Sequence, residues 1–144
     1  MKVITQNKKA RFEYQIEDTF EAGIVLKGTE IKSIRNGKVN INEAYIDLKN
    51  DELYIIGMHV SKYLESSIFN HDEKRDRKLL MHKNEILRLK TRKEKEGYTL
   101  IPLKVYFNKA LVKVEIAVAK GKKLHDKRQA LKEKDEQKRI KENY

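Results

Sequence analysis

Apolar and polar residues alternate along much of the first half of the chain. The alternation covers residues 12–16 and continues over residues 20–26, after a short polar break at residues 17–19. A repeat of two residues predicts a β-strand with one face buried and the other in solvent. We therefore expect two strands here, separated by the polar break.

The next alternating segments predict a β-hairpin. Apolar side chains recur at every second position over residues 44–48, and a second apolar run follows at residues 53–56. Asn50 and Asp51 lie between the two runs, and both residue types favour tight turns. The pattern therefore predicts two short antiparallel strands joined at these residues.

A longer hairpin is predicted near the end of the patterned region. Residues 101–107 and 112–118 each carry apolar side chains at alternate positions, with Asn108–Lys109 between them. The apolar residues of each strand are expected to share one face, which leaves Tyr106 on the other. The proline at position 102 removes a backbone donor, so we expect an edge or an unpaired position there.

Two segments follow a helical pattern instead. Thr29–Arg35 is expected to form a short helix that stops at Gly37, and His82–Glu96 a longer one that stops at Gly97. Three basic residues share one face of the longer helix: Arg88, Arg92 and Lys95. Many short strands with few helices predict a mainly β fold, a small antiparallel OB-like barrel with two or three short helices. A β-sandwich is the alternative that the pattern leaves open.

The chain changes character after Ala119. Residues 120–144 contain few aliphatic side chains and many charged ones, so they have too little apolar surface to bury. Their composition nevertheless favours helices. We expect an OB-like body over residues 1–119 and a basic tail over residues 120–144, which is disordered when free and becomes helical on binding.

Charge and composition narrow the classes of function. The chain has 144 residues, 33 Lys and Arg, 22 Asp and Glu, and a formal net charge of +11. The positive charge is concentrated in residues 1–11, 71–96 and 120–144, around a net acidic segment. The chain has no cysteine, which excludes disulfides and thiolate sites. It also shows neither a membrane-spanning run nor a signal peptide pattern, so we expect a cytoplasmic protein with a polyanionic partner.

Three basic clusters are candidate phosphate contacts. The first is Asn7–Arg11, which contains Lys8, Lys9 and Arg11. The second is Lys74–Lys78, which contains Arg77 and Lys78, and the third is Lys120–Lys123, which contains Lys122 and Lys123. Lysine and arginine bind a nucleic acid backbone with release of counterions. Tyr63, Tyr98 and Tyr106 are candidates for stacking on bases. A small barrel with basic edges favours RNA over DNA, since the sequence shows no recognition helix in a helix-turn-helix arrangement.

Catalytic motifs are missing from the sequence. It contains no nucleophile elbow, phosphate-binding loop or dinucleotide-binding turn, and we expect no enzyme activity and no cofactor. One alternative remains at His71–Asp72–Glu73, three adjacent residues that could serve a metal-dependent nuclease. Three consecutive residues on a strand cannot all point inward, which favours a solvated loop instead.

Several motifs, taken in order, resemble the SsrA-binding protein (small protein B) family, whose members are partners of tmRNA. The matching segments are Asn7–Arg11, Phe20–Ile24, Gly28–Ser33, His71–Asp72, Arg75, Arg77–Leu80 and Ala119–Arg128. Glu73 and Met81 depart from the family pattern, which usually has proline and leucine at these positions. The resemblance extends from Asn7 into the tail.

The resemblance implies an OB-like barrel and a role in ribosome rescue. It implies binding of the tRNA-like domain of tmRNA, delivery to stalled ribosomes, and an indirect link to elongation factor Tu through tmRNA. Asn7, Glu21 and Leu80 match family positions associated with tmRNA binding. An outward strand residue is the ordinary interpretation of Glu21, and a core residue that of Leu80.

The same resemblance assigns a role to the tail. The segment His125, Asp126, Lys127 and Arg128 matches residues associated with the decoding centre, near small-subunit rRNA, and the residues beyond it become helical in the vacant mRNA channel. A plain basic tail is the simpler alternative. A ribosomal or generic structured-RNA-binding protein is the alternative for the whole chain.

Overall fold

The computed structural model describes residues 2–64 and 70–122 of the chain. Within these residues the strands are β1 (Lys2–Gln6), β2 (Tyr14–Ile24), β3 (Val39–Asn40), β4 (Tyr45–Lys49), β5 (Glu52–Ile56), β6 (His59–Val60), β7 (Arg77–Leu80), β8 (Thr99–Asn108) and β9 (Leu111–Gly121). The helices of the described part are α1 (Ala10–Glu13), α2 (Gly28–Arg35) and α3 (Lys83–Glu94). None of these helices has the length and apolar character needed to cross a membrane.

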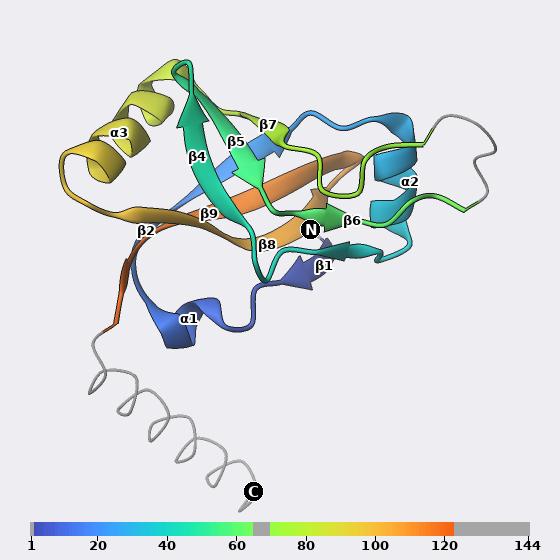
Figure 1. Cartoon of the computed structure of the whole chain (residues 1–144), viewed down its shortest axis with the longest axis horizontal. Coiled ribbons are helices and arrows are strands. Elements are labelled where there is room, and N and C mark those ends of the chain that lie inside the picture. The colour runs from blue at the N-terminus through green and yellow to red at the C-terminus, as the bar shows by residue number, and fades with distance from the viewer. Residues whose placement is uncertain (1, 65–69, 123–144) are drawn as a thin grey trace, which may run out of the picture.

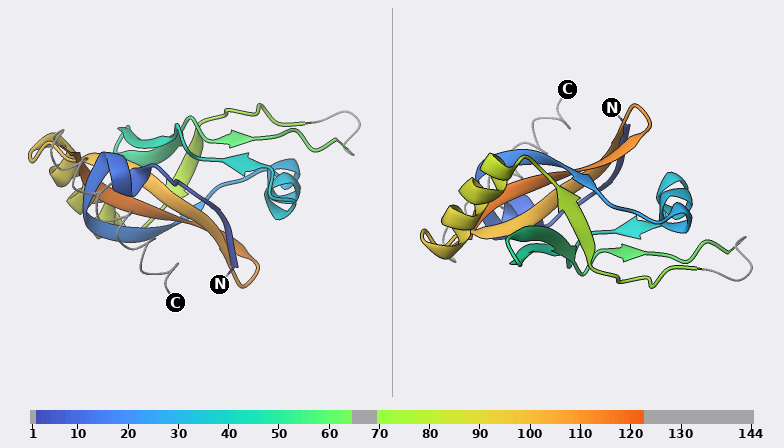
Figure 2. Two further views of the ribbon diagram at one scale, coloured as in Figure 1. Left: turned by 90° about the horizontal axis from the view of Figure 1, so that it is seen from below. Right: turned by 90° about the horizontal axis from the view of Figure 1, so that it is seen from above.

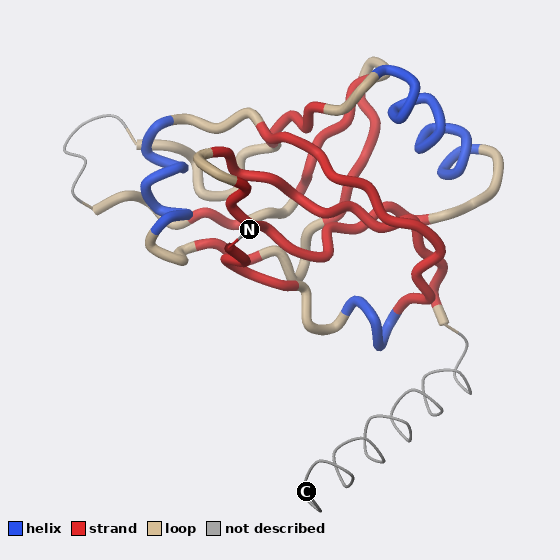
Figure 3. Tube along the Cα trace, turned by 180° about the vertical axis from the view of Figure 1, so that it is seen from behind, coloured by secondary structure: helices blue, strands red, loops and turns tan. Residues whose placement is uncertain are grey.

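Seven strands form one antiparallel sheet in the order β1-β8-β9-β2-β7-β5-β4, and β3 pairs with β6. The sheet curls until β4 lies against β8, with α3 at one end and α2 at the other (Figure 1). Figure 3 shows the strands at the centre and the helices at the periphery. The expected fold class, a mainly β, OB-like antiparallel barrel with short helices, is confirmed.

The main core lies inside the curled sheet. The strand β9 contributes four alternate apolar residues to it, as its sequence predicts: Val112, Val114, Ile116 and Val118. A second, smaller cluster lies on the opposite side of β8 and β9, beneath α1, and consists of Ala10, Ile101, Leu103, Ala117 and Ala119. Both faces of this hairpin are therefore buried near α1.

A β-bulge in β8 means that its apolar residues do not all share one face, whereas the sequence pattern predicted that they would. The pairing register with β9 shifts between Pro102 and Lys104, which inserts an extra residue at this point. Ile101 and Leu103 consequently face the second cluster, while Val105 lies in the main core. The irregularity expected at the proline is present, and it splits the four apolar residues that the pattern placed on one face.

The first predicted strand also differs from the structure. Phe12 belongs to the one-turn helix α1, and β2 begins only at Tyr14. The polar residues 17–19 do not end the strand, since β2 continues through them with a register shift between Ile16 and Asp18. A bulge adds one residue and changes which side chains face inward, so the pattern looks interrupted although the strand is continuous.

Both predicted hairpins are confirmed. Asn50 and Asp51 join β4 to β5 with φ values of 52° and 61°, the left-handed conformation that a tight hairpin turn requires. Asn108 pairs with Leu111 across the second hairpin, so its turn is formed by residues 109–110, one position later than expected. The helices α2 and α3 lie within one or two residues of their predicted bounds.

Candidate nucleic-acid interface

One face of the sheet brings together residues that are distant in sequence. Gln6, Lys104, Glu115 and Glu21 pair in a row across β1, β8, β9 and β2, and Tyr106, Lys113, Gly23 and Leu80 pair in the next row. Paired residues point to the same side of a sheet. We call these eight residues the outer face, because they lie opposite the main core. Glu21 and Leu80 therefore belong to one surface.

Asn7 lies at the edge of the outer face, in the turn between β1 and α1. Its backbone amide donates to the carbonyl of Leu103 at 2.7 Å, and its Nδ2 donates to the carbonyl of Pro102 at 3.3 Å. Its Oδ1 is buried and has no hydrogen-bond partner within the described structure. An unpaired buried acceptor is costly, so this oxygen is suited to a donor from a ligand, such as a 2′-hydroxyl or a base amino group.

The side chain of Asn7 lines a small pocket of about 270 Å³. The lining residues are Gln6, Asn7, Lys8, Arg11, Leu103, Lys104 and Glu115. Lys8 and Arg11 are exposed, as is Lys9, and none of the three forms an ion pair with a described residue. These cations are therefore available to phosphates beside the unpaired amide oxygen.

Lys122 links the last strand to this basic turn. Its backbone amide donates to the carbonyl of Glu13 at 3.0 Å, and its Nζ donates to the carbonyl of Arg11 at 2.9 Å. Strand β9 continues to Gly121, so the chain leaves the body next to α1. The remaining predicted tail residues lie outside the described residues: Lys123, His125, Asp126, Lys127 and Arg128.

Glu21 is held in place by Tyr106. The Tyr106 hydroxyl donates a hydrogen bond to the Glu21 carboxylate across the intervening strand β9. Only 3% of Tyr106 is exposed, and Lys104 Nζ lies 5.5 Å from the centre of its ring. Burial and then the Glu21 carboxylate raise the pKa of the Tyr106 hydroxyl, which remains a donor. The predicted stacking role of Tyr106 is therefore wrong, because its ring is covered.

Leu80 is an apolar contact at the far end of the outer face. It is 51% exposed, although it follows the buried Leu79. It pairs with Gly23, and a Cβ on that glycine would come within 3.4 Å of the Leu80 side chain. Lys78 points the same way, and its Nζ lies 3.0 Å from Glu52. Leu80 is accessible to an unstacked base, as the predicted contact requires.

Arg77 does not belong to this surface. Its side chain is 0% exposed, and its guanidinium forms a buried ion pair with Glu30. It also donates to the carbonyl of Met58 at 2.7 Å and to that of Arg75 at 3.0 Å. The predicted phosphate contact of Arg77 is therefore wrong, because its donors are used inside the protein.

The buried pair joins α2 to the first residue of β7. Glu30 also accepts from Arg75 at 2.6 Å and from the backbone amide of Lys27 at 2.7 Å. Burial alone would raise the pKa of Glu30, but Arg75, the Lys27 amide and Arg77 together lower the pKa below its ordinary value. Glu30 is therefore ionised at neutral pH and fixes the loop that carries the second basic cluster.

The other two candidate stacking residues lie under cations. Lys120 Nζ lies 4.5 Å from the centre of the Tyr98 ring and Arg92 Cζ lies 5.3 Å from it. The half-buried ring of Tyr63 has Lys32 Nζ at 5.3 Å. Stacking of a base on either ring would therefore require the cation to move aside.

The three candidate metal-binding residues, His71, Asp72 and Glu73, contact three different partners. His71 is buried and its Nε2 lies 2.8 Å from the carbonyl of Val60. Asp72 accepts from the amide of Lys74 at 3.0 Å, and Glu73 lies 2.7 Å from His59. Among residues 2–64 and 70–122, no three His, Asp or Glu side chains are grouped to hold a metal ion. The geometry in the described part does not support the metal-nuclease alternative.

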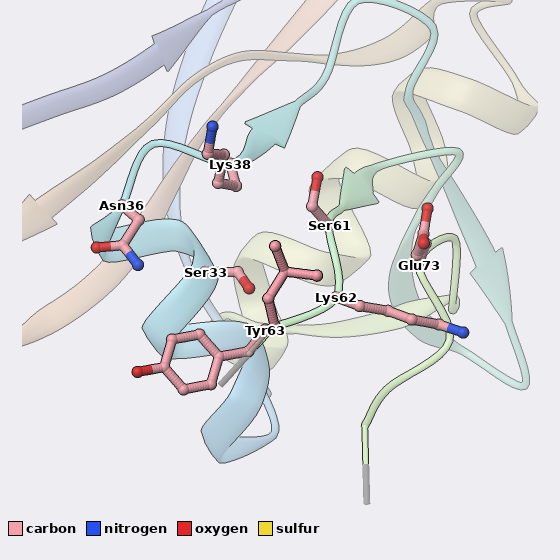
Figure 4. A pocket seen from close by; sticks show the side chains of 8 residues that line it. Ser33, Asn36, Lys38, Ser61, Lys62, Tyr63 and Glu73 are labelled. Atoms are coloured by element: carbon pink, nitrogen blue, oxygen red, sulfur yellow. The ribbon is translucent and has the colours of Figure 1, made fainter. Parts of the chain in front are cut away.

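A larger recess of about 490 Å³ is lined by residues that follow β6, by the end of α2 and by Glu73. Figure 4 shows the side chain of Tyr63, from the segment after β6, reaching toward α2, which carries Ser33 and is followed by Asn36. The carboxylate of the recess, Glu73, is the one that pairs with His59. Of the residues predicted to contact RNA, Tyr63 lines this recess and Asn7, Glu21 and Leu80 do not.

Comparison with known proteins decides the family. Residues 4–144 match the family model described as SmpB protein. The chain belongs to this family. It is 55% identical over 139 residues to the SsrA-binding protein of Alkaliphilus metalliredigens, which covers 96% of this chain and 88% of that protein. It is 57% identical over 135 residues to the SsrA-binding protein of Acholeplasma laidlawii, which covers 94% and 91%.

A solved structure supports the same conclusion. It is described as "tmRNA-SmpB: a journey to the center of the bacterial ribosome", and one of its chains matches this SmpB-family protein with a TM-score of 0.69. That chain is 45% identical, and the match covers 83% of this chain and 85% of that one. The resemblance predicted from the sequence motifs is confirmed.

Proposed function

We propose that the protein binds the tRNA-like domain of tmRNA and delivers it to stalled ribosomes for trans-translation. The observation that carries this proposal is the convergence of Asn7, Glu21 and Leu80 on one edge and face of the sheet. The similarity to a tmRNA–SmpB chain solved with the bacterial ribosome supports it.

The three residues offer complementary contacts. The unpaired Oδ1 of Asn7 accepts a hydrogen bond, Glu21 accepts from base amino groups or a 2′-hydroxyl, and Leu80 packs on an unstacked base. Lys8, Lys9 and Arg11 bind phosphates beside Asn7. An acidic residue repels phosphates, so Glu21 selects for a base or sugar and limits nonspecific binding.

The tail supplies a second encounter. Lys122 lies next to α1, and in our proposal residues 123–144, which follow it in the sequence, enter the vacant mRNA channel near small-subunit rRNA. His125, Asp126, Lys127 and Arg128 contact the decoding centre. The residues after them become helical only when the channel supplies contacts, since they have little apolar surface of their own.

The protein acts as a non-enzymatic adaptor in the cytoplasm. Its partners are tmRNA and the ribosome, with elongation factor Tu linked through tmRNA, and it needs no cofactor, membrane or DNA. A binding site made of hydrogen-bond acceptors, cations and one exposed leucine recognises RNA without reacting with it.

Sequencing the RNA that copurifies with the full chain tests the proposal directly. We expect tmRNA to be enriched over total RNA, and the isolated tRNA-like domain to outcompete bulk tRNA and rRNA for the purified protein. Equal affinity for all three RNAs would instead support a ribosomal or generic structured-RNA-binding protein.

A further inference from the structure

A recess at the tip of the β8–β9 hairpin is lined by three cations and one aromatic ring. It has a volume of about 630 Å³ and is lined by Lys2, Arg35, Phe107, Lys109 and Ala110. These residues come from β1, from the last turn of α2 and from the tip of the β8–β9 hairpin. In both views of Figure 2 this hairpin tip lies beside the start of β1. We call it the Phe107 recess.

The cations of the Phe107 recess are not neutralised by the described protein. Lys2, Arg35 and Lys109 are exposed and form no ion pair within residues 2–64 and 70–122, and no carboxylate lines the recess. Several other surface lysines are paired with a carboxylate within 3.1 Å, namely Lys49, Lys78, Lys90, Lys93 and Lys104. Three exposed cations with no carboxylate beside them are suited to a polyanion.

The Phe107 recess and the outer face lie on opposite sides of the same sheet. Lys2 pairs with Phe107, whereas Val3 pairs with Tyr106, and neighbouring residues on a strand point to opposite faces. An RNA segment bound at Glu21 and Leu80 therefore does not cover Phe107. The two surfaces can be occupied at the same time.

We infer that the Phe107 recess is a second RNA-binding site of the body, which takes a single-stranded segment. The three cations contact successive phosphates. The Phe107 ring packs against the main core on one side, and the part of it that lines the recess stacks on an unpaired base. An aromatic ring among cations favours a nucleic acid over an acidic peptide, which has no base to stack. The inference rests on the proposed function only in that the protein already binds RNA on the outer face.

Fluorescence anisotropy with a short labelled oligouridylate tests the site. The full chain is first saturated with the tRNA-like domain RNA, and the oligouridylate is then titrated into the complex. We expect binding at low salt that the bound RNA does not prevent. The triple variant Lys2→Gln, Arg35→Gln, Lys109→Asn should reduce the log–log salt slope by about 2, since each single-strand phosphate contact contributes about 0.7. Asparagine at position 109 tolerates the φ of 58° found there.

The base contact is tested separately. Phe107→Leu keeps an apolar side chain but removes the stacking surface, so oligouridylate affinity should fall at least about fivefold with the salt slope unchanged. A control triple variant, Lys83→Gln, Arg88→Gln, Lys95→Gln, removes the same charge from exposed positions on and beside α3, at the other end of the molecule. It should retain the wild-type slope.

Three results would overturn the inference. If the control triple variant lowers the salt slope as much as the recess variant, binding reflects net charge alone. If the tRNA-like domain displaces the oligouridylate, there is a single site. If oligoglutamate competes as well as oligouridylate, the recess recognises acidic chains and not RNA. Retained binding of the tRNA-like domain by the recess variant shows that it is folded and that the proposed function stands independently.

Discussion

The hydroxyl of Tyr106 donates a hydrogen bond to the carboxylate of Glu21, which lies on a strand that is not its neighbour. The bond passes over β9 and fixes one carboxylate oxygen of Glu21, so the other is left to accept from RNA. Tyr106 is buried and its raised pKa keeps the donor proton in place at all physiological pH values. Tyr106 is thus a positioning residue for Glu21.

Removal of this hydroxyl should weaken tmRNA binding without unfolding the protein. For Tyr106→Phe we expect a loss of about fivefold to tenfold in affinity for the tRNA-like domain, because a freed Glu21 must be ordered again on binding. Isothermal titration calorimetry measures the affinity, and urea unfolding measures the stability. The free energy of unfolding should fall by about 1 kcal/mol.

A double-mutant cycle with Glu21→Gln separates positioning from general damage. If Tyr106 acts through Glu21, the affinity losses of the two single variants should not add in the double variant. Additive losses would contradict the positioning role and indicate that Tyr106 contributes by a route of its own.

Leu80 and Leu87 provide a matched pair for the apolar contact. Both side chains are 51% exposed, but Leu80 lies on the outer face and Leu87 on α3. We expect Leu80→Ser to lower affinity for the tRNA-like domain by about tenfold, as the burial of a large apolar side chain contributes about 1.5–3 kcal/mol. Leu87→Ser should leave the affinity unchanged in the same binding assay, and an equal loss would argue against a specific contact.

The buried Glu30 makes stability depend on pH in acid. Its pKa is lower in the folded chain than in the unfolded chain, where a glutamate has a pKa of about 4.3. The ionised carboxylate therefore stabilises the fold above that pH, and this contribution disappears as the pH falls through the lower folded-state pKa. We expect the wild-type free energy of unfolding to decrease steeply from about pH 4 downwards.

Glu30→Gln should remove this dependence and destabilise the protein at neutral pH. The substitution leaves Arg77 buried without a counter-charge, at a cost of about 3–5 kcal/mol. Urea unfolding at several pH values should show the two proteins differing most at neutral pH and converging in acid. Asp51→Asn is the control. Asp51 also pairs with a basic residue, Lys90, and its pKa is also lowered, but it is exposed, so little change is expected.

The pattern of the sequence predicted β2, β4, β5, β8 and β9, but it predicted neither β1, β3, β6 and β7 nor the buried charge. Arg77 is buried and points inward like Leu79, whereas Lys78 between them is half-buried and points outward. The inclusion of Arg77 in a basic cluster instead suggested a surface contact. What makes its burial possible is Glu30, 47 residues earlier on another element, and such a long-range partner leaves no local signal.

The outer face also depends on long-range contacts that the local sequence pattern does not reveal. Glu21 and Leu80 were identified through the family resemblance, while their ordinary interpretations were a plain strand residue and a core residue. Their common location depends on the register between β2 and β7, in which Gly23 pairs with Leu80. Strand order and bulges are decided by tertiary packing, and so the covering of Tyr106 and the unpaired Asn7 oxygen emerge only from the structure.

The division between body and tail gives the sharpest functional prediction. Removal of residues 123–144 retains the contacts of Lys122 with Arg11 and Glu13, so the body should keep its stability and its affinity for the tRNA-like domain within about twofold. Tagging of peptides on stalled ribosomes should be abolished in a reconstituted translation assay, because nothing then occupies the vacant mRNA channel. As a control, Lys127→Ala, Arg128→Ala in the full chain should retain RNA affinity and lose part of the tagging activity. If truncation weakens RNA binding and tagging in parallel, the tail belongs to the tmRNA interface and the proposed division of roles is wrong.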